Sequence, residues 1–343
     1  MKAVQLMGAG QLEVNEVPDP IIVKATDAIV KVTHSAICGA DLLPYHGWTP
    51  GFEWGTIPGH EFVGEVVEVG ADVATARVGA RVVNTSMTSC GTCEYCRRYM
   101  PTQCVHRALF GYSGVYPRLD GGQAELVRVP LADRSLWEVP PSVTSESAVF
   151  IADILPTGFA ALERGGVRSQ DCVVVLGCGP VGLMAIMTAV GQARIVIAVD
   201  SIEARRDKAA ELGAVSVNPD GAMQTVLASS HGMGADVVIE ASGSVLALDA
   251  SFSLARPRGT ISVVGAHFEP DYPLNNAQMF EKELSLVFSV GNPSKDREKL
   301  MAALETGSLA PESIVSHTIP LGEAQQAYED FDSKKALKII LTP

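Results

Sequence analysis

The pattern of apolar and polar positions changes near residue 146. Before that point, short apolar stretches alternate with polar residues and are separated by glycine and proline, which is typical of strands and turns. Helical periodicity is almost absent there, so the pattern predicts an all-β, barrel-like domain. The stretches that predict strands are 2–6, 12–17, 28–36, 62–69, 80–83 and 124–129.

After residue 146, strand and helix patterns alternate. The continuous apolar run 173–176 is expected of a strand buried on both faces, and a helix pattern follows over 180–190. Such alternation gives a parallel, doubly wound sheet. Further strands are predicted at 195–199, 215–217, 237–239, 261–264 and 284–288, and further helices at 202–212, 221–230 and 244–255.

The last fifty residues depart from this alternation. Helices are predicted at 295–306 and 322–331, and a strand at 336–341. A chain of 343 residues is long enough for two domains, and the fold class is therefore α/β.

Charge and hydropathy exclude several kinds of partner. The formal net charge is −13, whereas nucleic acids and anionic membrane surfaces need clustered Lys and Arg. No stretch approaches 18 uninterrupted apolar residues, and the N-terminus has no signal-peptide pattern. We therefore expect no nucleic acid, no membrane span and a cytoplasmic location.

Four of the seven cysteines lie within fifteen residues, as Cys90, Cys93, Cys96 and Cys104. Structural zinc sites use four thiolates and leave no open position, so this spacing predicts a structural zinc lobe over about 88–105. Two disulfides, a redox pair or an iron–sulfur cluster are the alternatives. Crowding of this kind in a large, otherwise cysteine-poor chain favours a metal.

A second metal site is indicated by residues at turns of the β-rich part. Cys38 and His60 lie 22 residues apart, and Asp153 stands inside an apolar segment at the domain junction. A catalytic zinc needs three protein ligands and one open position. Taken singly, each residue has an ordinary alternative: a buried cysteine, a hydrogen-bonded histidine, and an N-cap or exposed helix residue.

A glycine-rich motif follows the strand 173–176 and begins a helix. Glycines in this pattern let the backbone approach a pyrophosphate, which rests on the helix N-terminus. Asp200 ends the next strand, where a carboxylate accepts ribose hydroxyls and repels a 2′-phosphate, so NAD is favoured. Arg205 and Arg206 keep NADP as an alternative. The motif consists of Gly177, Cys178, Gly179, Pro180, Val181 and Gly182.

Taken in order along the chain, these motifs resemble the zinc-dependent medium-chain alcohol dehydrogenases over essentially the full length. The resemblance implies a GroES-like catalytic domain formed by 1–147 and 287–343, and a Rossmann NAD-binding domain formed by 148–286. It also implies a homodimer or homotetramer that acts on a small alcohol or carbonyl. The matching motifs are Cys38 with Asp41, Gly59-His60-Glu61, the four cysteines, Pro156-Thr157-Gly158 and the glycine motif.

The resemblance also implies roles for single residues. Cys38, His60 and Asp153 would bind the catalytic zinc, with Asp in the third position as in many members of the bacterial tetrameric branch. Glu61 would approach the zinc or its water, and Asp41 would accept the N–H of His60. Two zinc ions per chain are expected. The nicotinamide would lie against Thr157 and against the backbone near Val264, Gly265 and Val287–Ser289.

One departure concerns proton transfer. The family usually has Ser or Thr two residues after the ligand Cys and often a His at the fifth, but this chain has Ala40 and Leu43. We therefore expect His46, Glu61 or water to carry the alcohol proton. Reduction of a conjugated C=C bond in an enal is the alternative, since some relatives that lack the hydroxyl favour it.

Residues 45–54 are rich in aromatic side chains in a chain with 6% aromatic residues. In the family this segment borders the substrate cleft, so it indicates a bulky apolar or aromatic alcohol. Packing within a loop or between subunits is the alternative. A polyol dehydrogenase and a non-catalytic NAD- or zinc-binding protein are the remaining functional alternatives.

Overall fold

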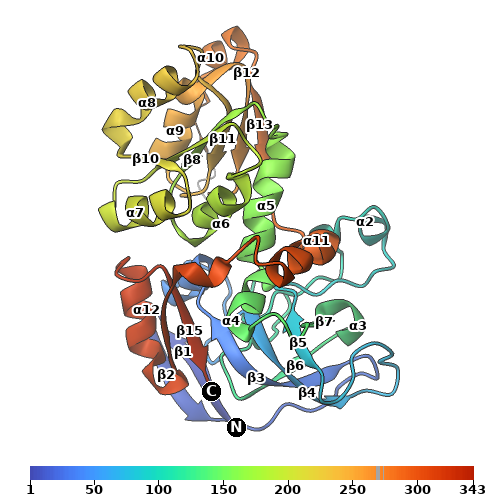
Figure 1. Cartoon of the computed structure of the whole chain (residues 1–343). Coiled ribbons are helices and arrows are strands. Elements are labelled where there is room, and N and C mark those ends of the chain that lie inside the picture. Colours follow the sequence, from blue (N-terminus) through green and yellow to red (C-terminus); the bar gives the residue numbers. More distant parts are fainter. Residues whose placement is uncertain (268–270, 273) are drawn as a thin grey trace. The chain divides into compact units, whose positions relative to one another are not determined.

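The chain forms two compact units, one of them discontinuous in sequence (Figure 1). The computed structural model describes residues 1–267, 271–272 and 274–343. The first unit comprises Met1–Asp153 and Asn292–Pro343, and the second comprises Ile154–Gly291. The divisions lie a few residues beyond the predicted positions 147 and 286.

The first unit is built on two sheets. Strands β1 and β2 pair as an antiparallel hairpin, and a seven-stranded sheet has the order β14-β15-β3-β4-β5-β7, with β6 paired to β3. All six strands predicted before residue 146 are confirmed. The strands are β1 (Lys2–Gly8), β2 (Gln11–Glu16), β3 (Ala28–Ala36), β4 (Glu61–Val69), β5 (Arg81–Asn84), β6 (Leu126–Val129), β7 (Leu136–Glu138), β14 (Val315–Pro320) and β15 (Lys338–Thr342).

Helices are few and short before Asp153. Four have only four residues each, too short for a 3.6-residue period to be visible in the sequence. They are α1 (Leu42–Tyr45), α2 (Glu94–Arg97), α3 (Ala132–Ser135) and α4 (Ser145–Ala148). The C-terminal segment adds α11 (Pro293–Glu305) and α12 (Ala324–Asp332), the second of which packs Tyr328 and Phe331 into a core with Ile339 and Leu341 of β15.

The second unit holds the predicted doubly wound sheet, which is confirmed. Six parallel strands have the order β10-β9-β8-β11-β12-β13. The strands are β8 (Cys172–Leu176), β9 (Ile195–Val199), β10 (Val215–Val217), β11 (Ala235–Glu240), β12 (Ala255–Val263) and β13 (Ser285–Phe288). The helices are α5 (Ile154–Gly165), α6 (Pro180–Ala189), α7 (Glu203–Glu211), α8 (Ala222–Ser229), α9 (Val245–Leu254) and α10 (Asn276–Glu281).

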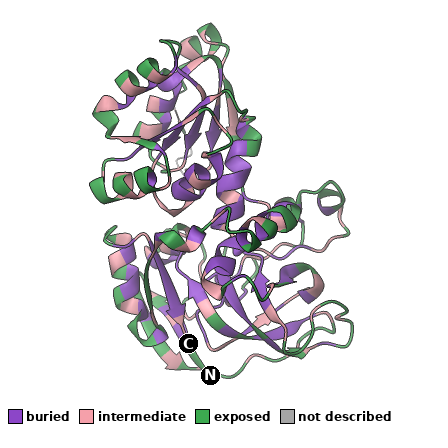
Figure 2. Cartoon of the chain, in the orientation of Figure 1, coloured by how far each residue is buried: buried purple, intermediate pink, exposed green. Residues whose placement is uncertain are grey.

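Both faces of this sheet are covered, which is why its strands are apolar throughout. Val174 and Val238 pack with Val226 of α8 and Phe252 of α9 on one face. Helices α5 and α6 lie together beside the sheet. In Figure 2 the central strands are buried while the outer helices carry exposed residues. The carboxyl ends of the strands are thus held rigidly, and the glycine motif follows one of them.

Among the described residues, no single helix has the length and apolar composition needed to cross a membrane. The consecutive helical segments Ser145–Ala152 and Ile154–Gly165 reach that length and composition only as a bent pair.

Candidate metal centres and nucleotide site

One cluster of metal-binding side chains forms where two antiparallel strands meet. Cys38 follows β3 and His60 immediately precedes β4. The strand register pairs Ala36 with Glu61. Antiparallel pairing therefore carries the end of β3 to the start of β4, and Cys38 lies close to His60 although they are distant in sequence.

Asp153 completes this cluster from a third segment. It follows the 3-10 helix Val149–Ala152, and its side chain is 25% exposed. Asp153 Oδ2 lies 3.4 Å from His60 Nε2 and 3.8 Å from Cys38 Sγ. The Ser86 hydroxyl donates to Oδ1 at 3.4 Å. The carboxylate therefore faces the other two side chains, as a third metal ligand would.

These separations fit a tetrahedral zinc ion. With Zn–S of about 2.3 Å and Zn–N and Zn–O of about 2.1 Å, the N···O distance would be about 3.4 Å and the S···O distance about 3.6 Å. His60 Nε2 is buried and has no hydrogen-bond partner among the described residues. Glu61 belongs to the same group, in which the potential ligand atoms all lie within 4.8 Å of one another. The donor set could therefore hold zinc.

Asp41 ties two of these residues together. It is 1% exposed, and its Oδ1 lies 3.0 Å from His60 Nδ1 while its Oδ2 accepts the Cys38 backbone N–H at 2.9 Å. An Nδ1–H···Oδ1 bond fixes the tautomer that leaves Nε2 free for a metal. Burial lowers the pKa of His60, but the charges of Asp41 and Cys38 outweigh it and raise that pKa well above its usual value.

The four-cysteine lobe forms the second cluster. Its sulfur atoms all lie within 4.8 Å of one another, and Cys93 Sγ is 3.9 Å from Cys104 Sγ. Tetrahedral thiolates around zinc are about 3.8 Å apart, whereas a disulfide is about 2.05 Å long. Backbone N–H donors, chiefly that of Thr92, lower the pKa of the Cys90 thiol to about 5. Burial raises the pKa of the Cys96 thiol to about 12, so the sulfur separations, rather than the thiol pKa values, are what fit a metal.

The glycine motif has the close backbone approach that a nucleotide site needs. An ideal Cβ at Gly182 would lie 1.8 Å from the Gly177 carbonyl oxygen, so only glycine fits. Helix α6 begins at Pro180, and Gly179 is its N-cap. The peptide N–H groups at this helix start are available to an anion.

Asp200 stands beside the motif, as the sequence predicted. It is buried, and its two oxygens accept the backbone N–H of Cys178 at 2.7 Å and of Ile202 at 2.8 Å. Arg205 Nε is buried without a hydrogen-bond partner among the described residues, and its Nη1 is 3.7 Å from an ideal Cβ at Gly179. The Arg205 guanidinium therefore lies over the motif.

Two family models match the chain: the alcohol dehydrogenase GroES-like domain over residues 24–141 and the zinc-binding dehydrogenase over residues 180–306. The probable zinc-binding alcohol dehydrogenase Rv1895 of Mycobacterium tuberculosis is 36% identical over 329 residues, which cover 96% of this chain and 84% of the relative. The chain belongs to the zinc-dependent medium-chain alcohol dehydrogenases. It is thus an oxidoreductase with the GroES-like and Rossmann fold predicted above.

The names of similar proteins in this family refer to different substrates. The structure of alcohol dehydrogenase TADH from Thermus sp. ATN1 has a TM-score of 0.95 and 38% identity, with 100% of this chain and 99% of that chain covered. Sorbitol dehydrogenase of Halalkalibacterium halodurans is 32% identical over 342 residues, with 98% of this chain and 97% of the relative covered.

Lys338 of the dehydrogenase was missed by sequence reasoning. It is fully buried, forms an ion pair with buried Glu61, and donates to the Ile37 carbonyl at 3.0 Å. Burial raises the pKa of Glu61 to about 7, although Lys338 opposes this rise. A lysine at the start of the apolar run Ile339–Leu341 is the sequence signal that could have indicated it.

Glu240 was missed as well. It ends β11 and accepts the backbone N–H of Ser242 at 2.8 Å and of Gly243 at 3.1 Å. Its carbonyl accepts the N–H groups of Val264 and Gly265 at 2.8 and 2.9 Å. Fully buried Glu240 therefore holds the turn after β11 through its carboxylate, and the turn at Val264 and Gly265, predicted to receive the nicotinamide, through its backbone carbonyl.

The other predicted cofactor residues lie in the same unit. Ser289 follows β13, and its N–H donates to the Val263 carbonyl at 2.8 Å. An ideal Cβ at Gly291 would lie 2.2 Å from Thr157 Oγ1, so Thr157 of α5 packs against the end of this segment. The side chain of Val287 lines a separate cavity that is described below.

His46, predicted to carry a proton, is not among the clustered residues. Its Nε2 lies 3.0 Å from Asp332 Oδ1, and its ring stacks on Trp48 at 4.5 Å. Ala40 accepts a hydrogen bond from the buried Tyr112 hydroxyl through its carbonyl. Ala40 stands where the family has a side-chain hydroxyl, and here the Tyr112 hydroxyl is bonded to the backbone of that residue instead.

Proposed function

We propose that the protein is an NAD-dependent zinc enzyme that transfers a hydride between an alcohol and the matching carbonyl compound. The observation that carries this proposal is the cluster of Cys38, His60 and Asp153, whose atoms stand at zinc-ligand separations. In the residues that the structure describes, the orphaned His60 Nε2 supports the same conclusion.

Zinc at this cluster would supply Lewis acidity toward the oxygen of an alcohol or carbonyl substrate. The protein's own contribution is to hold the ligands in place. Asp41 fixes the tautomer of His60 and the backbone of Cys38. Lys338 holds the Glu61 carboxylate by an ion pair, which restrains the fourth potential ligand of the cluster.

A second zinc would be bound by the four cysteines of the lobe and would stabilise the fold. The lobe would then act as a closed site, because four thiolates leave no position for a substrate. Seven free thiols are compatible with the reducing cytoplasm in which we propose that the enzyme works.

NAD is the proposed cofactor of the second unit, and the first unit would be catalytic. Asp200 supports NAD over NADP, because its carboxylate oxygens each keep a lone pair for a ribose hydroxyl and repel a 2′-phosphate. Arg205 over the motif favours the NADP alternative, whereas Arg206 donates to the carbonyls of Asp200 and Ser201 at 3.0 and 2.9 Å.

The proposed substrate is a bulky apolar or aromatic alcohol. Trp48 and Trp54 of the aromatic segment are 68% and 45% exposed, which leaves large apolar surfaces available. A polyol is the second candidate, which the similarity to a sorbitol dehydrogenase favours. Reduction of an enal C=C bond is the third, since Ala40 lacks the usual hydroxyl. A homodimer or homotetramer is the proposed assembly.

A substrate panel followed at 340 nm, with NAD and NADP in parallel, tests the proposal. We expect turnover of hydrophobic alcohols with NAD and two zinc ions per chain. His60→Ala should abolish turnover, while His317→Ala, a change in β14, should keep it. Exclusive 1,4-reduction of an enal would overturn the assignment of an alcohol substrate. A folded protein with two zinc ions and no turnover of any substrate would overturn the proposal that it is an enzyme.

A further inference from the structure

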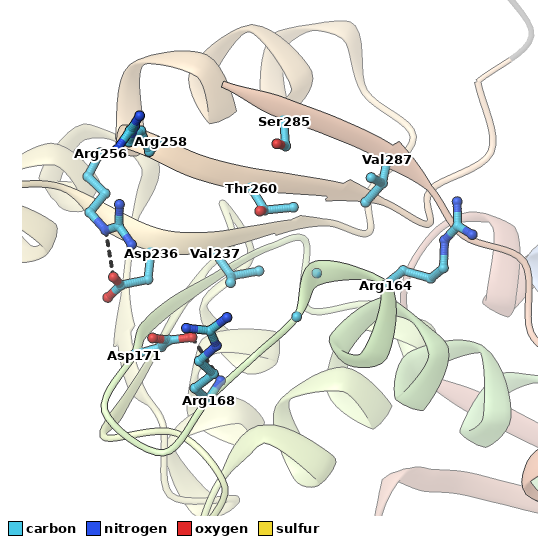
Figure 3. A pocket seen from close by; sticks show the side chains of 12 residues that line it. Arg164, Arg168, Asp171, Asp236, Val237, Arg256, Arg258, Thr260, Ser285 and Val287 are labelled. Carbon is cyan, nitrogen blue, oxygen red and sulfur yellow. Dashed lines mark hydrogen bonds and ion pairs between the residues drawn. The ribbon is translucent and has the colours of Figure 1, made fainter. Parts of the chain in front are cut away.

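A cavity of about 540 Å³ opens on the parallel sheet of the second unit (Figure 3). Helix α5 packs on this face of the sheet against β11 and β12, and an ideal Cβ at Gly165, its last residue, would lie 2.8 Å from Val237 Cγ1. The helix ends at Gly165, and the chain turns away through Gly166. The face nearest the amino ends of β11, β12 and β13 therefore stays uncovered.

Two hydroxyl groups lie on the floor of the cavity. The parallel register pairs Val237 with Thr260 and Thr260 with Ser285, so the three side chains form one row on one face. Figure 3 shows Thr260 and Ser285 on neighbouring strands. Neither hydroxyl forms a hydrogen bond with another residue in the part of the chain that the structure describes.

Two arginines at one side of the cavity are already paired. Arg256 Nε lies 2.6 Å from Asp236, and Arg258 Nε lies 2.8 Å from Glu283. Arg258 and Glu283 both have a left-handed backbone, with φ of 61° and 50°. Non-glycine residues in this region are strained, and such strain clusters at ligand sites. The pairing fixes the Arg256–Arg258 side of the cavity.

Two further arginines are uncommitted. Arg164 and Arg168 line the cavity from the end of α5 and the loop after it, and neither guanidinium pairs with a described residue. In Figure 3 the Arg168 guanidinium points from its loop toward the strands, and the Arg164 guanidinium lies on the opposite side of the view, beyond Val287. The nearby Asp171 accepts the backbone N–H of Arg168 at 2.8 Å. The two guanidinium groups that pair with no described residue thus line the cavity in a chain of net charge −13, together with the carboxylates of Asp171 and Asp236.

We propose that this cavity binds a multivalent oxyanion, a phosphate group or a polycarboxylate. Arg164 and Arg168 would supply the charge, and the hydroxyls of Thr260 and Ser285 would donate hydrogen bonds from the floor. The planar fork of a guanidinium matches two oxygens of such an anion.

This site is separate from the nucleotide motif. Asp171 stands just before β8, at its amino end, whereas the glycine motif follows the carboxyl end of the same strand. Nucleotides bind at the carboxyl ends of parallel strands. The proposed anion is therefore a second ligand of this unit and does not depend on the dehydrogenase activity.

Calorimetric titration of the full, zinc-loaded chain tests this site. Inorganic phosphate and succinate, which chelate zinc only weakly, are titrated at constant ionic strength, without NADH and with NADH saturating the nucleotide motif. We expect one anion per chain and no competition by NADH. Arg168→Gln and Thr260→Val should each weaken binding by about tenfold or more. The exposed Arg77→Gln should bind as the wild type does.

Four outcomes would overturn the proposal. The first is no binding by the wild type at millimolar concentration, and the second is equal binding by the variants (an adventitious ion only). The third is competition by NADH. The fourth is a sedimentation coefficient of Arg168→Gln that differs from that of the wild type, while the wild type binds no anion. The last outcome would assign the cavity to a contact between copies. Arg168 is exposed, so its variant folds and keeps the test decisive even where Thr260→Val does not.

Discussion

Replacement of Asp41 by asparagine should weaken zinc binding at the Cys38, His60 and Asp153 cluster and leave zinc binding at the four-cysteine lobe unchanged. The carboxylate accepts hydrogen bonds from both His60 Nδ1 and the Cys38 backbone N–H. An amide has only one oxygen, so its NH2 group must face one of these two donors. If it faces Nδ1, the histidine has to adopt the tautomer that carries its proton on Nε2, the nitrogen that the metal needs.

The size of the effect follows from this loss. A hydrogen bond to a charged group contributes about 1.5–3 kcal/mol, and each 1.4 kcal/mol corresponds to a factor of about ten in affinity. Asp41→Asn should therefore weaken zinc binding at Cys38, His60 and Asp153 by about 10- to 100-fold, the range found for partners of metal-bound histidines. The four-cysteine lobe should keep its zinc.

Competition with a chromogenic chelator measures both sites in one experiment, because the lobe serves as the internal standard. Asp133→Asn is the matched control, since that carboxylate also accepts backbone N–H groups, for instance that of Thr75 at 2.7 Å, outside both clusters. A folded Asp41→Asn protein that surrenders its two zinc ions as the wild type does would refute the reasoning.

Three further predictions concern stability. Hydrogen bonds from Ala74 and Thr75 outweigh burial and lower the pKa of Asp133. Because solvent screens this carboxylate, its contribution should be about 1 kcal/mol, present above pH of about 4 and lost as pH falls through the folded-state pKa. Urea unfolding of Asp133→Asn against pH measures this contribution, and a constant difference would contradict it. Lys338→Met leaves buried Glu61 unpaired and should cost about 3–5 kcal/mol in unfolding free energy, less with Glu61→Gln added; equal losses would argue against the pair. Cys93→Ser should lower Tm or disturb assembly and halve the zinc content, whereas a stable, assembled variant without turnover would speak against a structural lobe.

Apolar patterning predicted the strands well because most of them are buried on at least one face. It failed where other forces decide. Helix α5 was not predicted because Pro156 and Gly158 suggest a loop, yet Pro156 sits in the first turn, where its missing N–H costs nothing. Strand β14 was missed because its exposed residues show no clear alternation.

Some residues of the candidate site could be selected from the sequence and others could not. Cys38, His60 and the four cysteines could be selected from spacing and resemblance, and their role as ligands stays a prediction. Lys338 could not be selected, because its pairing with Glu61 spans 277 residues and depends on which strands lie beside one another. Glu240 was hidden at the end of an apolar strand for the same reason.

The discontinuity of the first unit has a consequence for the order of folding. Residues 154–291 are contiguous and can fold as soon as they leave the ribosome. The unit with the candidate metal cluster needs β15, whose Ile340 pairs with Ala36 of β3 across some three hundred residues of chain. Closing so long a loop is slow. The lysine that pairs with Glu61 is thus synthesised 277 residues after it, and a nascent chain can complete the proposed metal site only once Lys338 has left the ribosome.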